Sequence, residues 1–281
     1  MKKLVLTLFT LCCIGISFSQ IKTPQPSPSS VITQTVGISK ITVNYSRPGA
    51  KDRAIFGELV PYNKIWRTGA NKATAITFES DVIFGETKVK KGTYSLFTVP
   101  GESEWVVMLN KETELWGAGN YNKENEVASL KVDTKKTSDF TESFTIDFNT
   151  FTAFGAMMNL TWENIQVSVP VMTLGKEKLA EQFKKELVDG PDAGLFYNGA
   201  RFYLDNDLDI NLALEWITVA TQKRPEAFWM LYQQARILDK AGNKKEAIQA
   251  AQKVISIASK KEDDYGYIAR AEKLIKELKS K

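Results

Sequence analysis

Five side chains suited to binding an anion or a sugar are concentrated between two predicted strands: Arg47, Arg53, Trp66, Arg67 and Asn71. An arginine presents a rigid fork of N–H donors that matches a carboxylate, phosphate or sulfate group. A tryptophan offers a flat face to a sugar or an aromatic group. The segment therefore predicts a pocket for an anionic or glycan ligand.

The same segment also fits a purely structural interpretation. The arginines would pair with Asp52 and Glu58 and fix a long connection to the sheet, while Trp66 would belong to the core. Sequence alone leaves both interpretations open, because it does not place side chains from different loops in space.

Residue types that are missing narrow the possible chemistry. The chain contains no histidine, and its two cysteines, Cys12 and Cys13, lie in a segment that we expect to be removed. Ser-His-Asp and Cys-His catalysis and His-ligated zinc are thereby excluded, so we predict no metal site and no cofactor. An enzyme would have to use carboxylates, for example Glu58 with Glu104 or Asp52, as glycosidases do.

The charge balance argues against a nucleic-acid partner. The chain has 37 basic and 33 acidic residues, and removing Lys2 and Lys3 with the leader leaves 35 against 33, a net charge of 35 − 33 = +2. Phosphate contacts need a concentrated basic face, which so small an excess does not indicate.

The N-terminus predicts a secretory signal peptide over residues 1–19. Lys2 and Lys3 precede the apolar run 4–16, and the small-residue pattern 17–19 follows, with cleavage expected after Ser19. The apolar run is shorter than the ~20 residues of a spanning helix, and a Pro/Ser-rich linker occupies 20–30. Lipid attachment is the weaker alternative, because Leu11 rather than a small residue precedes Cys12. We expect an exported protein, periplasmic or extracellular, whose mature chain has no integral membrane anchor.

The pattern of residues 31–170 predicts an antiparallel β-sandwich. Short runs of β-branched and aromatic residues alternate with turn signals, which is typical of sandwiches and barrels. The expected strands are 31–36, 41–45, 73–78, 82–84, 93–99, 105–109, 144–148, 157–162 and 165–169, with a turn at 163–164. Apolar residues on both faces of 104–109 predict a central strand that is covered on both sides.

Beyond Pro170 and the expected linker 171–175, the pattern becomes helical, and residues 176–281 predict a small repeat-like domain. Leu179, Phe183 and Leu187 recur every four residues, and the helix should stop at 189–191. Two later segments align with each other at offsets of 34–35 residues: Ala200 with Ala235, Tyr203 with Leu238, and Ala213 with Ala247. This pattern resembles tetratricopeptide repeats, in which paired helices stack at small residues. We expect these helices to lean on the sandwich, with Asp209 as an N-cap and 267–278 as a terminal helix.

The segments Tyr45-Ser46-Arg47-Pro48, Ile65-Trp66-Arg67-Thr68-Gly69-Ala70-Asn71 and Gly92-Thr93-Tyr94-Ser95-Leu96 resemble a family of secreted bacterial proteins, domain-of-unknown-function family 2911. The resemblance covers roughly 29–171. It implies the fold and the exported compartment, and it carries no activity, cofactor or catalytic residue.

These observations predict an α+β protein, an antiparallel β-sandwich followed by a small α-helical, tetratricopeptide-like domain. The function they favour is an exported, non-catalytic binding or assembly module of the bacterial envelope. Its sandwich would hold an anionic or glycan ligand or a protein, and its helices would present a groove to a partner protein. The alternative is a carboxylate-dependent, glycosidase-like envelope hydrolase.

Overall fold

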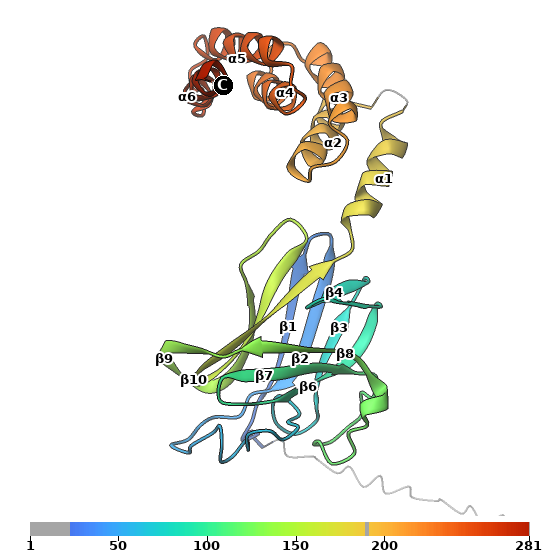
Figure 1. The fold of residues 1–281 in the computed structure, drawn as a ribbon, viewed down its shortest axis with the longest axis vertical. Helices are drawn as coiled ribbons and strands as arrows, with labels where there is room; N and C mark the ends of the chain where they lie inside the picture. The colour runs from blue at the N-terminus through green and yellow to red at the C-terminus, as the bar shows by residue number, and fades with distance from the viewer. Residues whose placement is uncertain (1–22, 189–190, 281) are drawn as a thin grey trace, which may run out of the picture.

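The computed structural model describes residues 23–188 and 191–280. The predicted signal peptide, its cleavage position near Ser19 and most of the helix breaker at 189–191 lie outside these residues. In the described part, two antiparallel sheets precede six α-helices, which is the α+β arrangement that the sequence predicts (Figure 1).

The larger sheet has six strands in the order β1-β2-β3-β6-β7-β8, and all neighbours are antiparallel. These strands are β1 (Ser29–Val36), β2 (Ser39–Ser46), β3 (Thr74–Phe78), β6 (Gly92–Val99), β7 (Glu104–Asn110) and β8 (Glu126–Asp133). A short 3-10 helix, Lys123–Asn125, precedes β8. The connection 47–73, which carries the candidate site, leaves the sheet after β2 and returns to it at β3.

The smaller sheet has the order β5-β4-β10-β9. Its strands are β4 (Val82–Phe84), β5 (Thr87–Val89), β9 (Lys135–Asn149) and β10 (Gly155–Thr173). The predicted turn at 163–164 is wrong, because β10 is one continuous strand there. Its register against β9 shifts on both sides of Glu163, which adopts φ 50°. A bulge of this kind bends a strand without ending it, so the turn-like residues mark a kink.

The expected linker 171–175 is also largely strand. Residues 171–173 pair with β4, and Val171 and Thr173 are buried. Proline has no backbone N–H to donate, but the pairing of β10 with β9 ends at Gln166. Pro170 therefore interrupts no hydrogen bond between these two strands.

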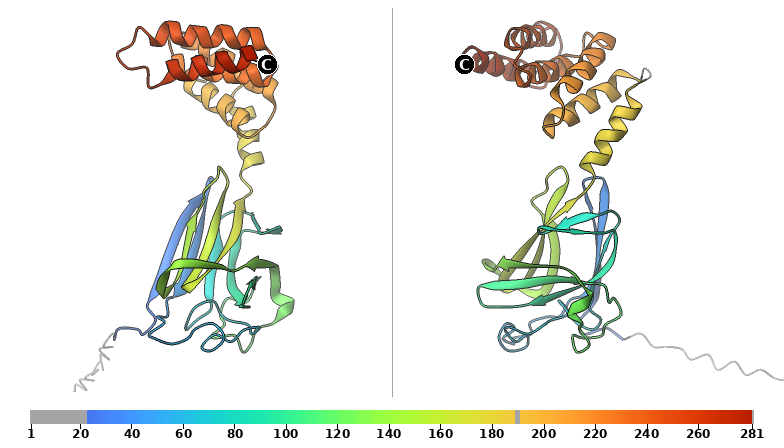
Figure 2. Two further views of the ribbon diagram at one scale, coloured as in Figure 1. Left: turned by 60° about the vertical axis from the view of Figure 1, so that its left-hand side comes forward. Right: turned by 45° about the vertical axis from the view of Figure 1, so that its right-hand side comes forward.

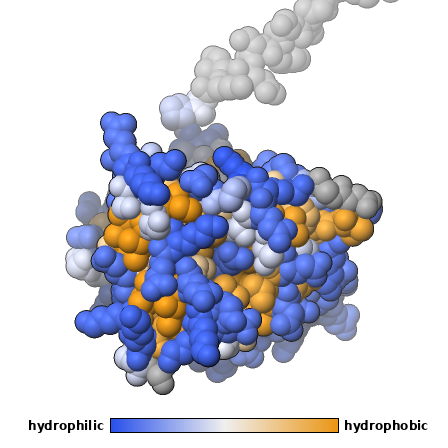
Figure 3. Space-filling view, turned by 90° about the horizontal axis from the view of Figure 1, so that it is seen from above, coloured by the Kyte–Doolittle hydropathy of each residue, from blue (hydrophilic) through white to orange (hydrophobic). Residues whose placement is uncertain are grey.

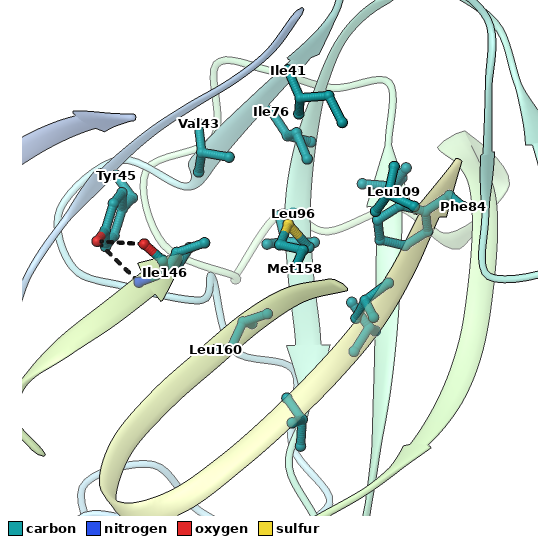
Figure 4. Packing of buried hydrophobic residues seen from close by; sticks show 14 of the residues in the cluster. Ile41, Val43, Tyr45, Ile76, Phe84, Leu96, Leu109, Ile146, Met158 and Leu160 are labelled. Atoms are coloured by element: carbon teal, nitrogen blue, oxygen red, sulfur yellow. Dashed lines mark hydrogen bonds between the residues drawn. The ribbon is translucent and has the colours of Figure 1, made fainter. Parts of the chain in front are cut away.

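One buried cluster joins the two sheets. Side chains from β2, β3, β6 and β7 point toward side chains from β9 and β10, as Figure 4 shows. The hydroxyl of Tyr45 lies at one side of this cluster, where it accepts a hydrogen bond from the Ile146 N–H at 3.0 Å.

The predicted central strand, β7, is confirmed. It lies between β6 and β8, and Trp105, Val107 and Leu109 enter the shared core. Met108, on its other face, is buried in a smaller cluster with Phe97. Both faces of β7 are therefore covered.

The helical part consists of α1 (Lys176–Glu186), α2 (Ala193–Asp205), α3 (Ile210–Lys223), α4 (Phe228–Lys240), α5 (Lys244–Ala258) and α6 (Tyr267–Ser280). The aligned positions of the two repeat-like segments are all buried in the helical clusters. The carboxylate of Asp209 accepts the N–H groups of Asn211 and Leu212, which confirms the predicted N-cap. No helix in the described ranges is long and apolar enough to cross a bilayer.

The helices pack mainly on one another rather than on the sheets. Their two buried clusters contain helical and inter-helical residues alone, so the expectation that they lean on the sandwich is wrong for their core. A ring contact of 6.0 Å between Phe154 and Phe202 links the two parts. Figure 2 shows the helices at one end of the sandwich and the connection 47–73 at the other.

Candidate functional site

The connection 47–73 is held against the end of the sandwich by backbone contacts. Trp66 and Thr98 of β6 exchange both of their backbone hydrogen bonds, at 2.7 and 2.9 Å. Carboxylates from the opposite sheet accept two further N–H groups: Glu142 accepts from Lys51 at 3.0 Å, and Glu163 accepts from Ile55 at 3.2 Å. The connection is therefore fixed to both sheets by contacts other than arginine ion pairs, none of which forms among its described partners.

Trp66 lies inside an aromatic cluster. It stacks on Trp162 with ring centroids 5.8 Å apart, and it meets Phe56, Trp105 and Phe144 edge-on. Only 9% of Trp66 is exposed. Little ring surface remains for a sugar to stack on, so the interpretation of Trp66 as a core residue describes its packing better than that of a sugar platform.

Arg47 and Asn71 anchor the connection to neighbouring strands. The Arg47 guanidinium donates to the carbonyl oxygen of Phe144 at 3.1 Å and to the hydroxyl of Thr145 at 2.6 Å. The Asn71 amide donates to the Ser46 hydroxyl at 3.2 Å. Both side chains therefore have structural partners.

Arg53 donates within its own loop, to the carbonyl oxygens of Ala50 at 2.9 Å and Gly49 at 2.7 Å. Within the described ranges, neither Asp52 nor Glu58 forms an ion pair with an arginine. The interpretation that these carboxylates neutralise the arginines is wrong, because the arginine partners here are carbonyl and hydroxyl oxygens.

Arg67 differs from the other two arginines. Its guanidinium donates no hydrogen bond and forms no ion pair among the described residues, and its Nε is shielded from solvent. Burial lowers the pKa of Arg67, because the surroundings disfavour the charged form. A partly buried cation without a counter-charge is costly, so this is the feature of the site that most needs an explanation.

The backbone that presents Arg67 is strained. Thr68 and Asn71 have φ values of 54° and 60°, and a positive φ is unfavourable for a β-branched residue such as Thr68. Buried hydrogen bonds hold this turn: the Thr68 hydroxyl donates to that of Thr98 at 3.2 Å, and the Thr74 hydroxyl donates to the Thr68 carbonyl. Strain of this kind persists where the surroundings enforce it, and it is frequent at ligand sites.

A cavity of about 260 Å³ opens beside Arg67. Its lining consists of Ser27, Pro48, Arg53, Leu59, Val60, Trp66, Arg67, Gly69, Ala70 and Trp162. Of the five predicted site residues, the fold brings Arg53, Trp66 and Arg67 to this cavity, whereas Arg47 and Asn71 are absent from the lining.

No carboxylate of the described residues lines this cavity, so the acid/base pairs suggested by the sequence do not meet there. Glu104 instead forms an ion pair with Lys131 of β8, in which Nζ and Oε1 lie 2.7 Å apart. Asp52 and Glu58 are exposed on the connection. The polar side chains of the cavity are two guanidinium groups and the hydroxyl of Ser27.

Sequence reasoning missed several lining residues. Trp162 reaches the cavity from β10, far along the chain, and Leu59 and Val60 read as ordinary loop residues. A second loop also approaches: a Cβ placed on Gly117 would lie 3.8 Å from an Nη of Arg67. The Gly-x-Gly string at 117–119 thus borders the site, although nothing in its sequence indicates that proximity.

A family described as "Protein of unknown function (DUF2911)" matches residues 27–171, which is 145 of the 281 residues and includes the whole lining of the cavity. No curated protein matches the chain.

Proposed function

Because the chain belongs to the DUF2911 family, whose description assigns no activity, we propose its function from the geometry: the protein is a non-catalytic binding module of the bacterial envelope. In this proposal the sandwich binds a small anionic ligand at Arg67. The helices present a groove to a partner protein.

The observation that carries the proposal is the unpartnered guanidinium of Arg67 beside a cavity. Arg47 and Arg53 have carbonyl or hydroxyl partners, whereas Arg67 has none among the described residues. An anion entering the cavity would supply the missing counter-charge in surroundings that strengthen the interaction.

The lining also explains why we propose binding rather than hydrolysis. A carboxylate-dependent glycosidase needs two carboxyl groups, one on each side of the scissile bond. The cavity offers guanidinium groups and apolar side chains instead. Such a surface can hold an anion but has no side chain suited to general acid catalysis near neutral pH.

The groove proposed for a partner protein lies on the helical part. Residues from α2, α4 and α6 line a hollow of about 440 Å³, with Leu204, Tyr232 and Leu274 as its apolar members. Seen from above, hydrophilic residues cover much of this face, and patches of hydrophobic residues are exposed between them (Figure 3). Several cations of the groove already pair with carboxylates, such as Arg236 with Asp205 at 3.5 Å, so charge alone selects no partner.

Export remains part of the proposal and rests on the signal-like N-terminus. The mature protein should begin at Gln20. Intact-mass analysis of the exported protein tests this, and a retained Met1 or a lipid adduct would contradict it.

Anion binding is tested by thermal unfolding of the mature protein at constant ionic strength with acetate, phosphate or sulfate. A ligand of the folded state must raise the melting temperature. We expect at least one of these anions to do so, and Arg67→Lys to weaken its binding by ~1–3 kcal/mol, because an ammonium cannot reproduce the planar fork.

Arg201→Lys is the matched control. Arg201 is an exposed arginine that pairs with Asp205 at 3.3 Å. It belongs to α2, which Figure 1 shows at the opposite end of the molecule from the connection 47–73. Its substitution should leave the anion effect unchanged. If both variants lost the anion-dependent rise in melting temperature equally, the anions would act through general surface charge, and the proposal would be refuted.

A further inference from the structure

We propose that the ligand at Arg67 is an amphiphilic monocarboxylate, with its carboxylate on the guanidinium and a short apolar body in the cavity. This inference rests on the proposed function and adds the chemical class of the ligand. It follows from the donors, the charge, the apolar walls and the size of the cavity.

The hydrogen-bonding groups of the lining favour a ligand that accepts rather than donates. Arginine side chains only donate, and among the lining side chains only the hydroxyl of Ser27 can accept. A buried sugar would bring several hydroxyl donors, each of which needs an acceptor. A carboxylate only accepts, so the side chains of this lining suit a carboxylate better than a glycan.

The charge at the cavity favours a single negative charge. Arg53 already donates its Nε and one Nη to backbone carbonyls and is exposed to water. Arg67 is the lining cation that lacks any partner within the described residues. Hydrogen bonds to carbonyls do not neutralise Arg53, but water screens its exposed charge. The half-buried charge of Arg67 is therefore the one that a single carboxylate would balance.

The walls of the cavity are suited to an apolar body. Six of its ten lining residues have apolar side chains: Pro48, Leu59, Val60, Trp66, Ala70 and Trp162. One of these residues, Leu59, is 45% exposed. A hydrocarbon chain in the cavity would cover it and remove apolar surface from water.

The size of the cavity limits the length of that chain. At ~30 Å³ for each water-sized group, a volume of about 260 Å³ holds about nine such groups. A carboxylate group occupies about three of them, which leaves room for about six more carbons. Acids of medium length should therefore fit, and longer ones should extend into solvent.

The test is a titration of the mature protein with acetate, butanoate, hexanoate, octanoate and decanoate at pH 7 and constant ionic strength. Glucuronate, phosphate and hexanol serve as comparison ligands. Each added CH₂ should strengthen binding by about fourfold while it is buried. The gain should stop between hexanoate and octanoate, and hexanol should bind far more weakly than hexanoate.

Three variants assign the effect to the cavity. Arg67→Met should abolish carboxylate binding, and Leu59→Ser should reduce the gain per CH₂. Ile65→Ser is the matched control, because Ile65 is 39% exposed on the same connection but does not line the cavity. It should reproduce the wild-type series.

The outcomes separate the two claims. Arg67-dependent binding of acetate or phosphate with no chain-length gain, or tighter binding of glucuronate than of hexanoate, would overturn the monocarboxylate and leave anion binding intact. If no anion of the series binds in an Arg67-dependent way, the proposed function itself fails.

Discussion

Arg67→Met should leave the ligand-free protein as stable as the wild type or make it more stable. Methionine keeps the apolar stem of the side chain and removes a half-buried charge that has no partner among the described residues. The substitution breaks no hydrogen bond between the guanidinium and the described residues, and it relieves a desolvation penalty of the order of 1–3 kcal/mol for an unsatisfied group. Because part of the guanidinium still reaches water, we expect a change between zero and a gain of ~1 kcal/mol in the free energy of unfolding.

Arg47→Met is the matched comparison. The Arg47 guanidinium donates to Phe144 and Thr145, at 3.1 and 2.6 Å. Hydrogen bonds to a charged group contribute ~1.5–3 kcal/mol each, and partial exposure lowers that value, so we expect a loss of ~2–4 kcal/mol. The two substitutions are chemically identical, yet only Arg47→Met should destabilise the protein.

The measurement is urea unfolding of both variants and the wild type, without added ligand and in a buffer that lacks carboxylates. Linear extrapolation gives the free energy of unfolding for each protein. A loss of ~3–5 kcal/mol in Arg67→Met, the amount expected when a buried ion pair is broken, would refute the reasoning. Arg67 would then be a structural residue, and the argument for a ligand would lose its main support.

Three further predictions concern the helices and the junction. Limited proteolysis should cut first near 188–192 rather than at 171–173, because Val188 is 70% exposed whereas residues 171–173 pair with β4. A first cut at 171–173 would contradict that pairing. Asp209→Ala should lower the free energy of unfolding by ~0.5–2 kcal/mol, since two N–H groups at the start of α3 lose their acceptor; an unchanged urea midpoint would contradict this. Asp264 accepts the N–H groups of Ile268 and Gly266, which lowers the pKa of its carboxyl below the ordinary 3.8. The ionised carboxylate therefore stabilises the fold above pH 3.8, and this contribution is lost as the pH falls below that value. The difference in melting temperature between wild type and Asp264→Asn should shrink in acid. A constant difference from pH 7 to pH 2 would exclude this role.

The sequence by itself determined the features that neighbouring residues specify. Alternation in 104–109 identified a strand covered on both faces, since adjacent side chains of a strand point to opposite sides. Asp209 was identified as a cap, because its carboxylate lies within reach of the first N–H groups of the helix that follows it. The aligned alanines were identified as helix contacts from their offset of 34–35 residues, because paired helices that repeat at such an offset stack at small residues. Local signals failed where long-range pairing prevailed. Glu163 looked like a turn and Pro170 like a boundary, yet β10 continues through both.

The sequence predicted only part of the candidate site, because long-range contacts also decide which side chains meet there. The sequence concentrated three arginines in one connection, but it gave no sign of which would have partners. Arg47 is satisfied by residues nearly 100 positions away, and Trp162 closes the cavity from the other sheet. Only the tertiary structure could therefore show that Arg67 has no partner among the described residues, because a partner is assigned by distance in space, and the sequence fixes distance only between near neighbours.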